Sequence, residues 1–352
     1  MTSTHTQNPE STVKSTMKAV VIKAHHPIEH PESFLDLELA TPVATGHDLL
    51  IAVKAVSVNP VDFKVRASRP GVELPEPRTL GFDGAGVVVA VGENVTLFQP
   101  GDEVYWSGSI VRAGSNAEYQ LVDERIVGKK PTTLDFAEAA ALPLTAITAW
   151  ESLFDRLRIS QRDQGKSILI IGGAGGVGSI AIQLAKHAGL KVIATASRPE
   201  TQTWVKEQGA DVVISHSNPL DEKLTAVGLP EVDFIFNTVN TVQYWEVSAK
   251  VIKPQGSIVA INGTPEKLPI GILFSKSVSF HWELMFTRST HQTPDMIEQH
   301  HLLNKVADQI DAGTLKTTLK ENVGTINAEN LKKAHARLES GQAIGKVVLS
   351  GW

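Results

Sequence analysis

A glycine-rich segment is the part of the sequence whose residue types and spacing point most directly to chemistry. The run Gly173–Gly178 fits the pattern G-x-G-x-x-G; the apolar run Ile168–Ile171 precedes it, and apolar residues at helical spacing follow it. In a dinucleotide-binding unit, one glycine permits the turn, another leaves room for a pyrophosphate, and the last lets helix and strand pack closely. The phosphates then lie at a helix N-terminus, which favours anions. We therefore predict a dinucleotide site; the alternative is a tightly packed strand–helix turn without a ligand. The predicted contacts are Gly173, Gly175, Gly176, Val177 and Gly178.

The residues after the next expected strand, Lys191–Thr195, indicate which dinucleotide binds. An NAD site usually has a carboxylate here that accepts hydrogen bonds from the ribose 2′-hydroxyl. This chain has Ser197 and Arg198 instead, and the first carboxylate is Glu200. A guanidinium is a planar, permanently charged partner for a 2′-phosphate, and the serine hydroxyl adds a donor. The sequence predicts NADP(H); the alternative is that Arg198 is only a solvated loop charge.

Length and composition limit the function classes. The chain has 352 residues, 42% of them hydrophobic and 20% charged, with a formal net charge of −5. The length favours two domains, and the mild acidity argues against nucleic acid as a partner. No apolar stretch approaches the ~18 residues that would span a bilayer. The first sixteen residues lack the apolar core of a secretory signal, so we expect a cytoplasmic protein without a membrane partner.

The absence of cysteine restricts metal chemistry. With no cysteine in the chain, disulfides, a thiolate nucleophile and cysteine-ligated zinc are excluded. Twelve histidines are present, and none has the H-E-x-x-H spacing. We therefore predict no metal site.

The pattern of elements changes along the chain. From Met17 to about Ala146, short apolar runs are separated by Gly, Pro and Asn, which indicates a compact and mostly antiparallel domain. Strands are expected at Lys18–Ile22, Leu49–Val56, Gly86–Val91 and Glu103–Trp106. Helices are expected at Asp135–Ala141 and from near Thr145.

The second half alternates strands with helices, which predicts a doubly wound parallel sheet of the α/β class. Strands are expected at Ile168–Ile171, Lys191–Thr195, Val212–Ser215, Asp233–Phe236, Ser257–Ile261 and Ser277–His281. Two helices, Met296–Ala312 and Asn327–Ser340, follow. The short apolar strand Gly345–Leu349 could return to the first domain.

Several motifs, in order from Met17 to the C-terminus, resemble the medium-chain dehydrogenase/reductase superfamily. The similarity is to its quinone oxidoreductase-like branch and the subgroup called zinc-type alcohol dehydrogenase-like. The motifs are Asn59–Asp62, Gly81–Gly86, Gly101–Val104, Leu142–Ala146, Phe234–Asn240, Ser279–Arg288 and Gly341–Leu349. The resemblance implies a Rossmann doubly wound parallel sheet together with a GroES-like, mostly antiparallel β domain.

The resemblance also implies a domain division. A flexible extension would cover residues 1–16, a GroES-like catalytic domain 17–146 and a Rossmann NADP(H)-binding domain 147–285. Residues 286–352 would return to the catalytic domain. Members of this superfamily usually form dimers through the edges of their nucleotide-binding sheets, so a homodimer joined near Ser277–His281 is expected by analogy.

The zinc positions of the superfamily conflict with the subgroup's name. Zinc-dependent members have a cysteine where this chain has Asn59 and a His-Glu pair where it has Phe82 and Asp83. The four structural cysteines found in many members between the positions of Asp102 and Asp123 are also absent. Because zinc needs about four N, S or O ligands, no zinc is expected.

Without zinc, the resemblance favours hydride transfer to quinones or α,β-unsaturated carbonyls, whose product anions are delocalised. Asn59, Asp62 and Tyr105 are the candidate catalytic residues, with Lys64 and Arg66 close by in sequence. A turn-stabilising role for Asp62 and a packing role for Tyr105 stay open. Two alternatives also stay open for the whole protein: an alcohol dehydrogenase, and a nucleotide-binding protein with vestigial catalysis.

The resemblance places further residues around the cofactor and the substrate. The implied cofactor contacts are Thr145, Asn237, Thr238, Asn240, Asn262, Gly263 and Lys346, the last at the pyrophosphate. Trp282 and Phe286 are candidates for the substrate pocket; the alternative is that they belong to the core or to an interface.

Overall fold

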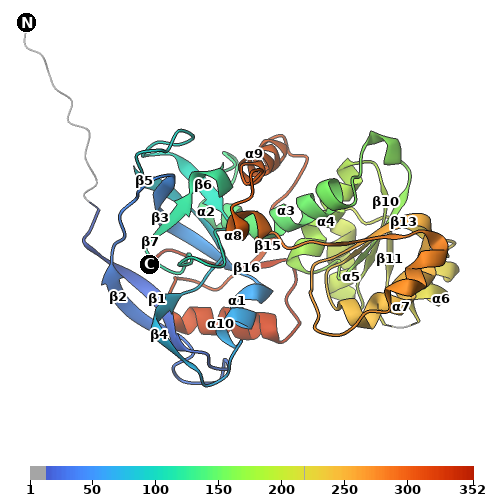
Figure 1. Cartoon of the computed structure of the whole chain (residues 1–352), viewed down its shortest axis with the longest axis horizontal. Coiled ribbons are helices and arrows are strands. Elements are labelled where there is room, and N and C mark those ends of the chain that lie inside the picture. The colour runs from blue at the N-terminus through green and yellow to red at the C-terminus, as the bar shows by residue number, and fades with distance from the viewer. Residues whose placement is uncertain (1–12, 218) are drawn as a thin grey trace, which may run out of the picture.

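A computed structural model describes residues 13–217 and 219–352. Most of the predicted extension, residues 1–12, lies outside the described residues. Two sheet systems lie side by side, with α3 and β16 between them (Figure 1). The α/β class with a parallel sheet and a GroES-like antiparallel region is confirmed.

The parallel sheet has the strand order β11-β10-β9-β12-β13-β14, which is the doubly wound order in which a crevice opens where the order reverses. All six predicted strands are present. They are β9 (Ser167–Ile171), β10 (Lys191–Thr195), β11 (Val212–Ile214), β12 (Val232–Asn237), β13 (Ile252–Ala260) and β14 (Ser279–Trp282).

Helices cover both faces of this sheet because alternate residues of a strand point to opposite sides. On β9, Ile168 and Ile170 belong to the core shared with α3, α4 and α5, whereas Leu169 and Ile171 belong to the core under α6 and α7. The helices are α3 (Pro143–Trp150), α4 (Gly176–His187), α5 (Pro199–Glu207), α6 (Leu220–Ala226) and α7 (Thr241–Val251).

The other sheet system contains the four strands predicted in the first half, the strand predicted at the C-terminus and five strands that were not predicted. Its strands are β1 (Thr16–Ala24), β2 (Leu35–Ala40), β3 (Asp48–Val58), β4 (Glu73–Thr79), β5 (Asp83–Val91), β6 (Glu103–Trp106), β7 (Tyr119–Asp123), β8 (Val127–Lys129), β15 (Leu319–Asn322) and β16 (Lys346–Ser350). All its named pairs are antiparallel except β15 with β16. β4 contains two prolines and pairs only with β1, as expected of an edge strand.

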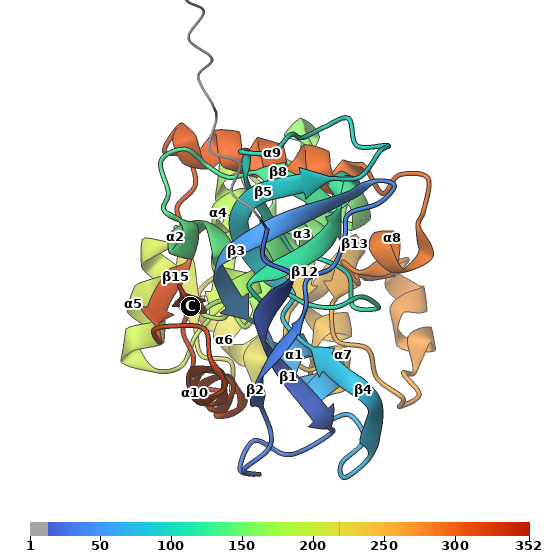
Figure 2. The same cartoon turned by 90° about the vertical axis from the view of Figure 1, so that its left-hand side faces the viewer.

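The last strand of the chain, β16, lies in the antiparallel sheet. β16 pairs antiparallel with β3, with Val347 opposite Val58. Figure 2 shows α9 across one end of this sheet and α10 at the other. The remaining helical elements are α1 (Pro60–Arg66), η1 (Glu124–Ile126), α2 (Phe136–Ala140), η2 (Glu151–Arg156), η3 (Gln161–Asp163), η4 (Ile270–Lys276), α8 (Thr287–His291), α9 (Glu298–Asp311) and α10 (Ala328–Glu339).

The predicted domain boundary at residue 146 falls inside α3, and the one at residue 285 falls between β14 and α8. The boundaries stay predictions. Within residues 13–217 and 219–352, no helix combines the length and the apolar character needed to cross a membrane.

Candidate active site

The glycine turn between β9 and α4 has the shape that a phosphate site needs. The left-handed residue is Gly172 (φ +89°), one position before the fingerprint. A Cβ at Gly178 would lie 2.3 Å from the Gly172 carbonyl oxygen, so this glycine allows α4 to approach β9. A Cβ at Gly175 would meet nothing closer than 3.7 Å. Because no side chain caps α4, its first N–H groups are available to an anion.

The C-terminal strand contacts this turn directly. Gly345 N donates to Ala174 O at 2.9 Å, and Gly345 forms an isolated bridge with Gly175. The stem of Lys346 then passes beneath the turn, since a Cβ at Gly176 would lie 2.8 Å from its Cδ. The Lys346 ammonium, which was expected at the pyrophosphate, points instead toward the antiparallel sheet.

The ammonium of Lys346 ends in a buried polar cluster around Asp83. Lys346 Nζ donates to Val58 O and Asp83 Oδ2, each at 3.0 Å, and also to Asn59 Oδ1. Asn59 Nδ2 donates to Asp83 Oδ2 at 2.7 Å. Ser57 Oγ and the Leu144 backbone N–H each donate to the same carboxylate at 2.7 Å. Asp83 is fully buried and is therefore held by four donors, one of them charged.

Asp62 lies in the first turn of α1, next to this cluster. Its Oδ2 accepts from the Asn59 backbone N–H at 2.7 Å, so it stabilises the start of the helix. Its Oδ1 is buried and has no hydrogen-bond partner among the described residues. Burial raises the pKa of Asp62 to about 7, and the neighbouring Lys346 opposes part of that rise. The structural role of Asp62 is therefore visible, and its carboxyl group can also exchange a proton near neutral pH.

The residues at the zinc positions do not fit a zinc ion. Asn59 and Asp83 already bind the Lys346 ammonium, and this fixed positive charge would repel a metal cation. Phe82 offers no ligand atom, and its ring packs edge-on against Phe286 with 5.4 Å between centroids. Across the residues that the structure describes, no group of three or more His, Cys, Asp or Glu side chains could hold a metal ion.

Lys64 is a candidate to which the sequence analysis assigned no role. Its Nζ donates to Asn262 Oδ1 at 2.8 Å, which joins α1 to the end of β13, a strand of the parallel sheet. Partial burial lowers the pKa of Lys64. The helical spacing of α1 distinguishes Lys64 from its neighbours. Asp62 and Arg66 are four residues apart, lie on one face and are both buried, whereas Lys64 between them lies on another face.

The hydroxyl of Tyr105 is directed toward α9. Tyr105 is fully buried, and its hydroxyl donates to Leu303 O on α9 at 2.6 Å. Burial, with Asp308 and Asp311 nearby, raises the pKa of Tyr105 well above its usual value. The geometry favours the packing alternative.

The other expected cofactor residues surround the turn. Thr145 is buried, its hydroxyl donates to Leu142 O, and its methyl group would lie 3.0 Å from a Cβ at Gly176. Thr238 Oγ1 donates to Ile171 O at 2.8 Å, and Asn262 Nδ2 donates to Thr238 O at 3.1 Å. These contacts join the carboxyl ends of β9, β12 and β13.

Two asparagines shape the loop after β12. Asn237 Nδ2 donates to Asn240 O at 3.1 Å, and Asn240 caps α7 by accepting from Gln243 N at 2.9 Å. At Gly263, after β13, an added Cβ would meet no atom within 4 Å. The two substrate candidates are separated: Phe286 is buried beside Phe82, whereas Trp282 is 45% exposed on the edge strand β14.

The expected 2′-phosphate region contains more polar groups than the sequence analysis named. Ser197 Oγ lies 2.7 Å from Ser215 Oγ and 3.0 Å from His216 Nδ1, because β10 and β11 end side by side. Arg198 Nε donates to Glu200 Oε1 at 2.6 Å, and its Nη2 donates to Gln342 O at 3.0 Å. The positive charge of Arg198 is therefore partly compensated by a neighbouring carboxylate.

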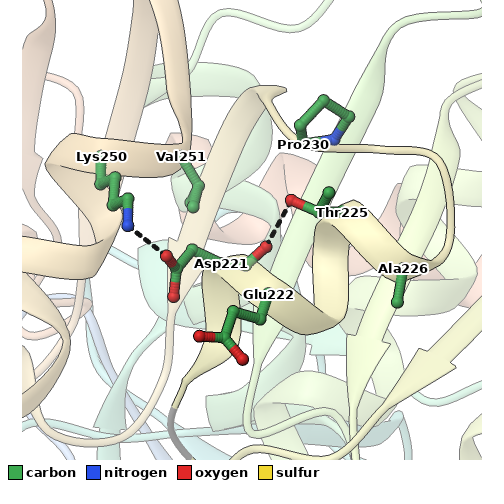
Figure 3. Close-up of a pocket in the computed structure, with 7 residues that line it drawn as sticks. All are labelled: Asp221, Glu222, Thr225, Ala226, Pro230, Lys250 and Val251. Atoms are coloured by element: carbon green, nitrogen blue, oxygen red, sulfur yellow. Dashed lines mark hydrogen bonds and ion pairs between the residues drawn. The ribbon is translucent and has the colours of Figure 1, made fainter.

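A pocket of about 480 Å³ lies elsewhere on the parallel-sheet half (Figure 3). It is lined by Asp221, Glu222, Thr225, Ala226, Pro230, Lys250 and Val251. The pocket lies at the amino ends of β12 and β13, because Ala226, Pro230 and Val251 come just before these strands. The glycine turn follows β9 and so lies at the carboxyl ends of the strands. The pocket is separate from the candidate active site.

The parallel sheet is doubly wound and has a phosphate-binding turn. The GroES-like sheet joined to it supplies polar groups to the same region. Together these features define an oxidoreductase of the dehydrogenase type. Comparisons with known proteins agree. Residues 45–132 match the alcohol dehydrogenase GroES-like domain, and residues 176–301 match the zinc-binding dehydrogenase family. The chain belongs to the medium-chain dehydrogenase/reductase superfamily, and its relatives there include the zinc-type alcohol dehydrogenase-like proteins.

Individual relatives cover nearly the whole fold. A zinc-type alcohol dehydrogenase-like protein of Staphylococcus epidermidis is 42% identical over 95% of this chain and 99% of its own. The NADPH-dependent alkenal/one oxidoreductase of Arabidopsis thaliana is 34% identical over 90% of this chain and 75% of its own. A Rhizobium etli crystal structure, named as a candidate zinc-dependent alcohol dehydrogenase, has 53% identity and a TM-score of 0.90 over 96% of this chain and 98% of that one. The Coxiella burnetii quinone oxidoreductase structure has 27% identity and a TM-score of 0.78 over 96% and 100%.

Proposed function

We propose that the protein is an NADPH-dependent reductase of quinones or α,β-unsaturated carbonyl compounds that works without zinc. The observation that carries the proposal is the Lys346–Asn59–Asp83 cluster, a buried cation with its ligands at the positions where zinc-dependent relatives bind their metal. Such a site lacks the Lewis acid that stabilises an alkoxide during alcohol oxidation. The Arabidopsis relative, named for NADPH and alkenal/one substrates, supports the same class of reaction.

The residues around the glycine turn fit the cofactor. The N–H groups at the start of α4 would bind the pyrophosphate, and Thr145 together with the ends of β12 and β13 would line the nicotinamide side. Ser197, Arg198, Ser215 and His216 would surround the 2′-phosphate. When bound, NADPH supplies the hydride.

Lys64 and Asn59 are the polar groups proposed to meet the substrate. Hydride addition to a conjugated carbon leaves an enolate or hydroquinone anion, whose oxygen carries the negative charge. The Lys64 ammonium, on the cleft between α1 and β13, stabilises that oxygen, and Asn59 helps to orient the carbonyl. A proton from water completes the reduction.

We also propose a cytoplasmic homodimer. β14 is an edge strand of the parallel sheet, and no described strand pairs with its outer side. Apolar side chains are exposed on and beside it, including Phe274 at 87% and Leu284 at 58%. A second copy paired along β14 would cover them, and sedimentation velocity tests this.

The activity is tested by following NADPH oxidation with a panel of quinones, enones and simple aldehydes, with and without a chelator. Reduction of quinones or enones that the chelator leaves unchanged is expected. Turnover of simple aldehydes that the chelator abolishes would contradict the proposal and favour the alcohol dehydrogenase alternative. Tight NADPH binding without turnover of any acceptor would favour a binding protein with vestigial catalysis.

The role of Lys64 gives a sharper test. Lys64→Met should lower kcat with enones about 100-fold, the usual effect of removing one donor to an oxyanion, and leave the NADPH Kd unchanged. Partial burial lowers the pKa of Lys64. The wild-type kcat should therefore fall as the pH rises, and this fall should occur at a lower pH than the one at which an ordinary lysine loses its proton. Lys64→Arg should keep kcat flat there. The exposed Lys267→Met is the matched control; an equal loss in both variants would refute the assignment.

A further inference from the structure

A cluster of charged and polar side chains, buried at its centre, surrounds Glu151 and Glu283 and takes no part in the proposed chemistry. Its members are Glu151, Asp155 and Arg156 on the π-helical turn η2, Glu283 after β14, Arg288 on α8, Asp295 before α9 and Gln299 within α9. Glu151 and Glu283 are 1% and 2% exposed, and their carboxyl groups are hydrogen-bond neighbours. Two acidic groups therefore share one water-excluded space.

Within the described residues, the hydrogen bonds in the cluster leave one buried carboxyl oxygen, Glu283 Oε1, without a donor. Glu151 Oε1 accepts from Arg288 Nη1 at 2.6 Å and from Gln299 Nε2 at 3.1 Å. Glu283 Oε2 accepts from Arg156 Nε at 2.7 Å, but its Oε1 is buried and has no donor among the described residues. A proton between the two carboxyl groups would satisfy this oxygen and remove the repulsion of two buried like charges. Consistent with this, burial and the neighbouring Glu151 raise the pKa of Glu283 to about 9.

The same cluster holds a wall of the proposed substrate site. Gln299 Nε2, besides bonding Glu151, donates to Met285 O at 2.7 Å. Met285 Sδ accepts from Ser107 Oγ at 3.8 Å, and the Phe286 ring meets Phe82 edge-on. Glu283 is two residues before Met285 in the chain. The position of residues 283–286 is therefore set on one side by the carboxyl pair and on the other by Ser107 and Phe82.

We propose that Glu151 and Glu283 share one proton and that this proton holds the Met285–Phe286 wall against Phe82. The assignment of the wall to the substrate rests on the proposed function. Loss of the proton to solvent leaves two adjacent buried carboxylates, whose repulsion separates the segment after β14 from η2. The charged groups bonded to the pair are Arg156 and Arg288, and Arg288 also binds Asp155 and Asp295. Glu283 is thus a positioning residue.

Hydrogen exchange of residues 283–292 in the full chain tests the shared proton without using activity. After correction for the intrinsic effect of pH, protection of these amides in the wild type should fall at least tenfold between pH 7 and pH 10. Glu283→Gln should keep its protection, because the amide donates to Glu151 and does not ionise. The exposed Glu298→Gln on α9 should behave like the wild type. Unchanged protection in the wild type, or equal loss in Glu283→Gln, would overturn the proposal.

A second variant covers the case in which Glu283→Gln does not fold. The Arg156 guanidinium favours ionised Glu283, so Arg156→Gln should move the midpoint of the opening to higher pH. An unchanged or lower midpoint would count against the shared proton.

The kinetic readout separates this inference from the proposed function. Over the same pH range, KM for the acceptor should rise in the wild type and not in Glu283→Gln, whereas the loss of the Lys64 ammonium acts on kcat. Opening of the segment with an unchanged KM would overturn the assignment of this wall to the substrate.

Discussion

At the scale of single residues, Lys346 links the two halves of the candidate active site. Its stem passes under the cofactor turn at Gly176, and its ammonium binds Asn59 and Asp83. Lys346 and Asp83 are both nearly inaccessible to water, with side chains 3% and 0% exposed. A buried ion pair of this kind tolerates removal of both charges far better than removal of one.

Lys346→Met should therefore lower the free energy of unfolding by about 3–5 kcal/mol, because it leaves the Asp83 carboxylate buried without its cation. The double variant Asp83→Asn with Lys346→Met should recover much of that loss. Urea denaturation of the two single variants and the double variant measures the coupling. Strict additivity would show that the two side chains do not depend on each other.

In the proposed cofactor site, Arg198 is the residue expected to favour NADPH over NADH. Arg198→Ala should raise the NADPH Kd about 10- to 100-fold, the loss of a charge-assisted contact worth roughly 1.5–3 kcal/mol, and change the NADH Kd little. His216→Ala should also raise the NADPH Kd, but by a smaller factor. Arg162→Ala, an exposed arginine on η3, is the control, and fluorescence titration gives the constants. Equal weakening of both cofactors would contradict the 2′-phosphate assignment.

At the scale of elements, the close contact of α4 with β9 depends on Gly178. A Cβ there would lie 2.3 Å from the Gly172 carbonyl oxygen, so Gly178→Ala must push the helix away from the strand. We expect a stability loss of about 1–3 kcal/mol and weaker NADPH binding, since the helix N-terminus moves with the helix. Gly271→Ala is the control, because an added Cβ there meets no atom within 4 Å. Thermal unfolding and cofactor titration measure both effects.

The elements that the sequence predicted are those with a local signal. The strands of the parallel sheet are continuous apolar runs, and the glycine turn is defined by its spacing. By contrast, β2 is half-exposed along its length and β4 contains two prolines, so their pairing depends on β1 rather than on their own residues.

The polar cluster was only partly predictable for the same reason. Asn59 and Asp83 could be named from motifs. The direction of the Lys346 ammonium depends on the register of β16 with β3, which joins residues 288 positions apart. Lys64 and Asn262 are 198 positions apart, so no local pattern pairs them.

At the scale of the whole molecule, buried titratable groups set how stability depends on pH. Burial lowers the pKa of His335 to about 3, so the unfolded chain binds a proton there that the folded chain does not, and this contribution raises stability with pH up to about 6.5. Asp62 and Glu283 act in the opposite direction. Their folded pKa values, about 7 and about 9, exceed the unfolded ones, so their contributions are complete below pH 4 and decline as pH rises through the folded values.

Between pH 7 and pH 9 the histidine contribution is constant, and Glu283 still holds a proton that the unfolded chain has lost. The free energy of unfolding should therefore fall across this range, by up to about 1.4 kcal/mol per pH unit for one proton. Glu283→Gln should flatten the profile above pH 7.5. Asp62→Asn should flatten only its lower part, between about pH 4 and pH 7. Urea titrations at closely spaced pH values separate the two. A profile that rises from pH 7 to pH 9 would mean that Glu283 is ionised in the folded protein.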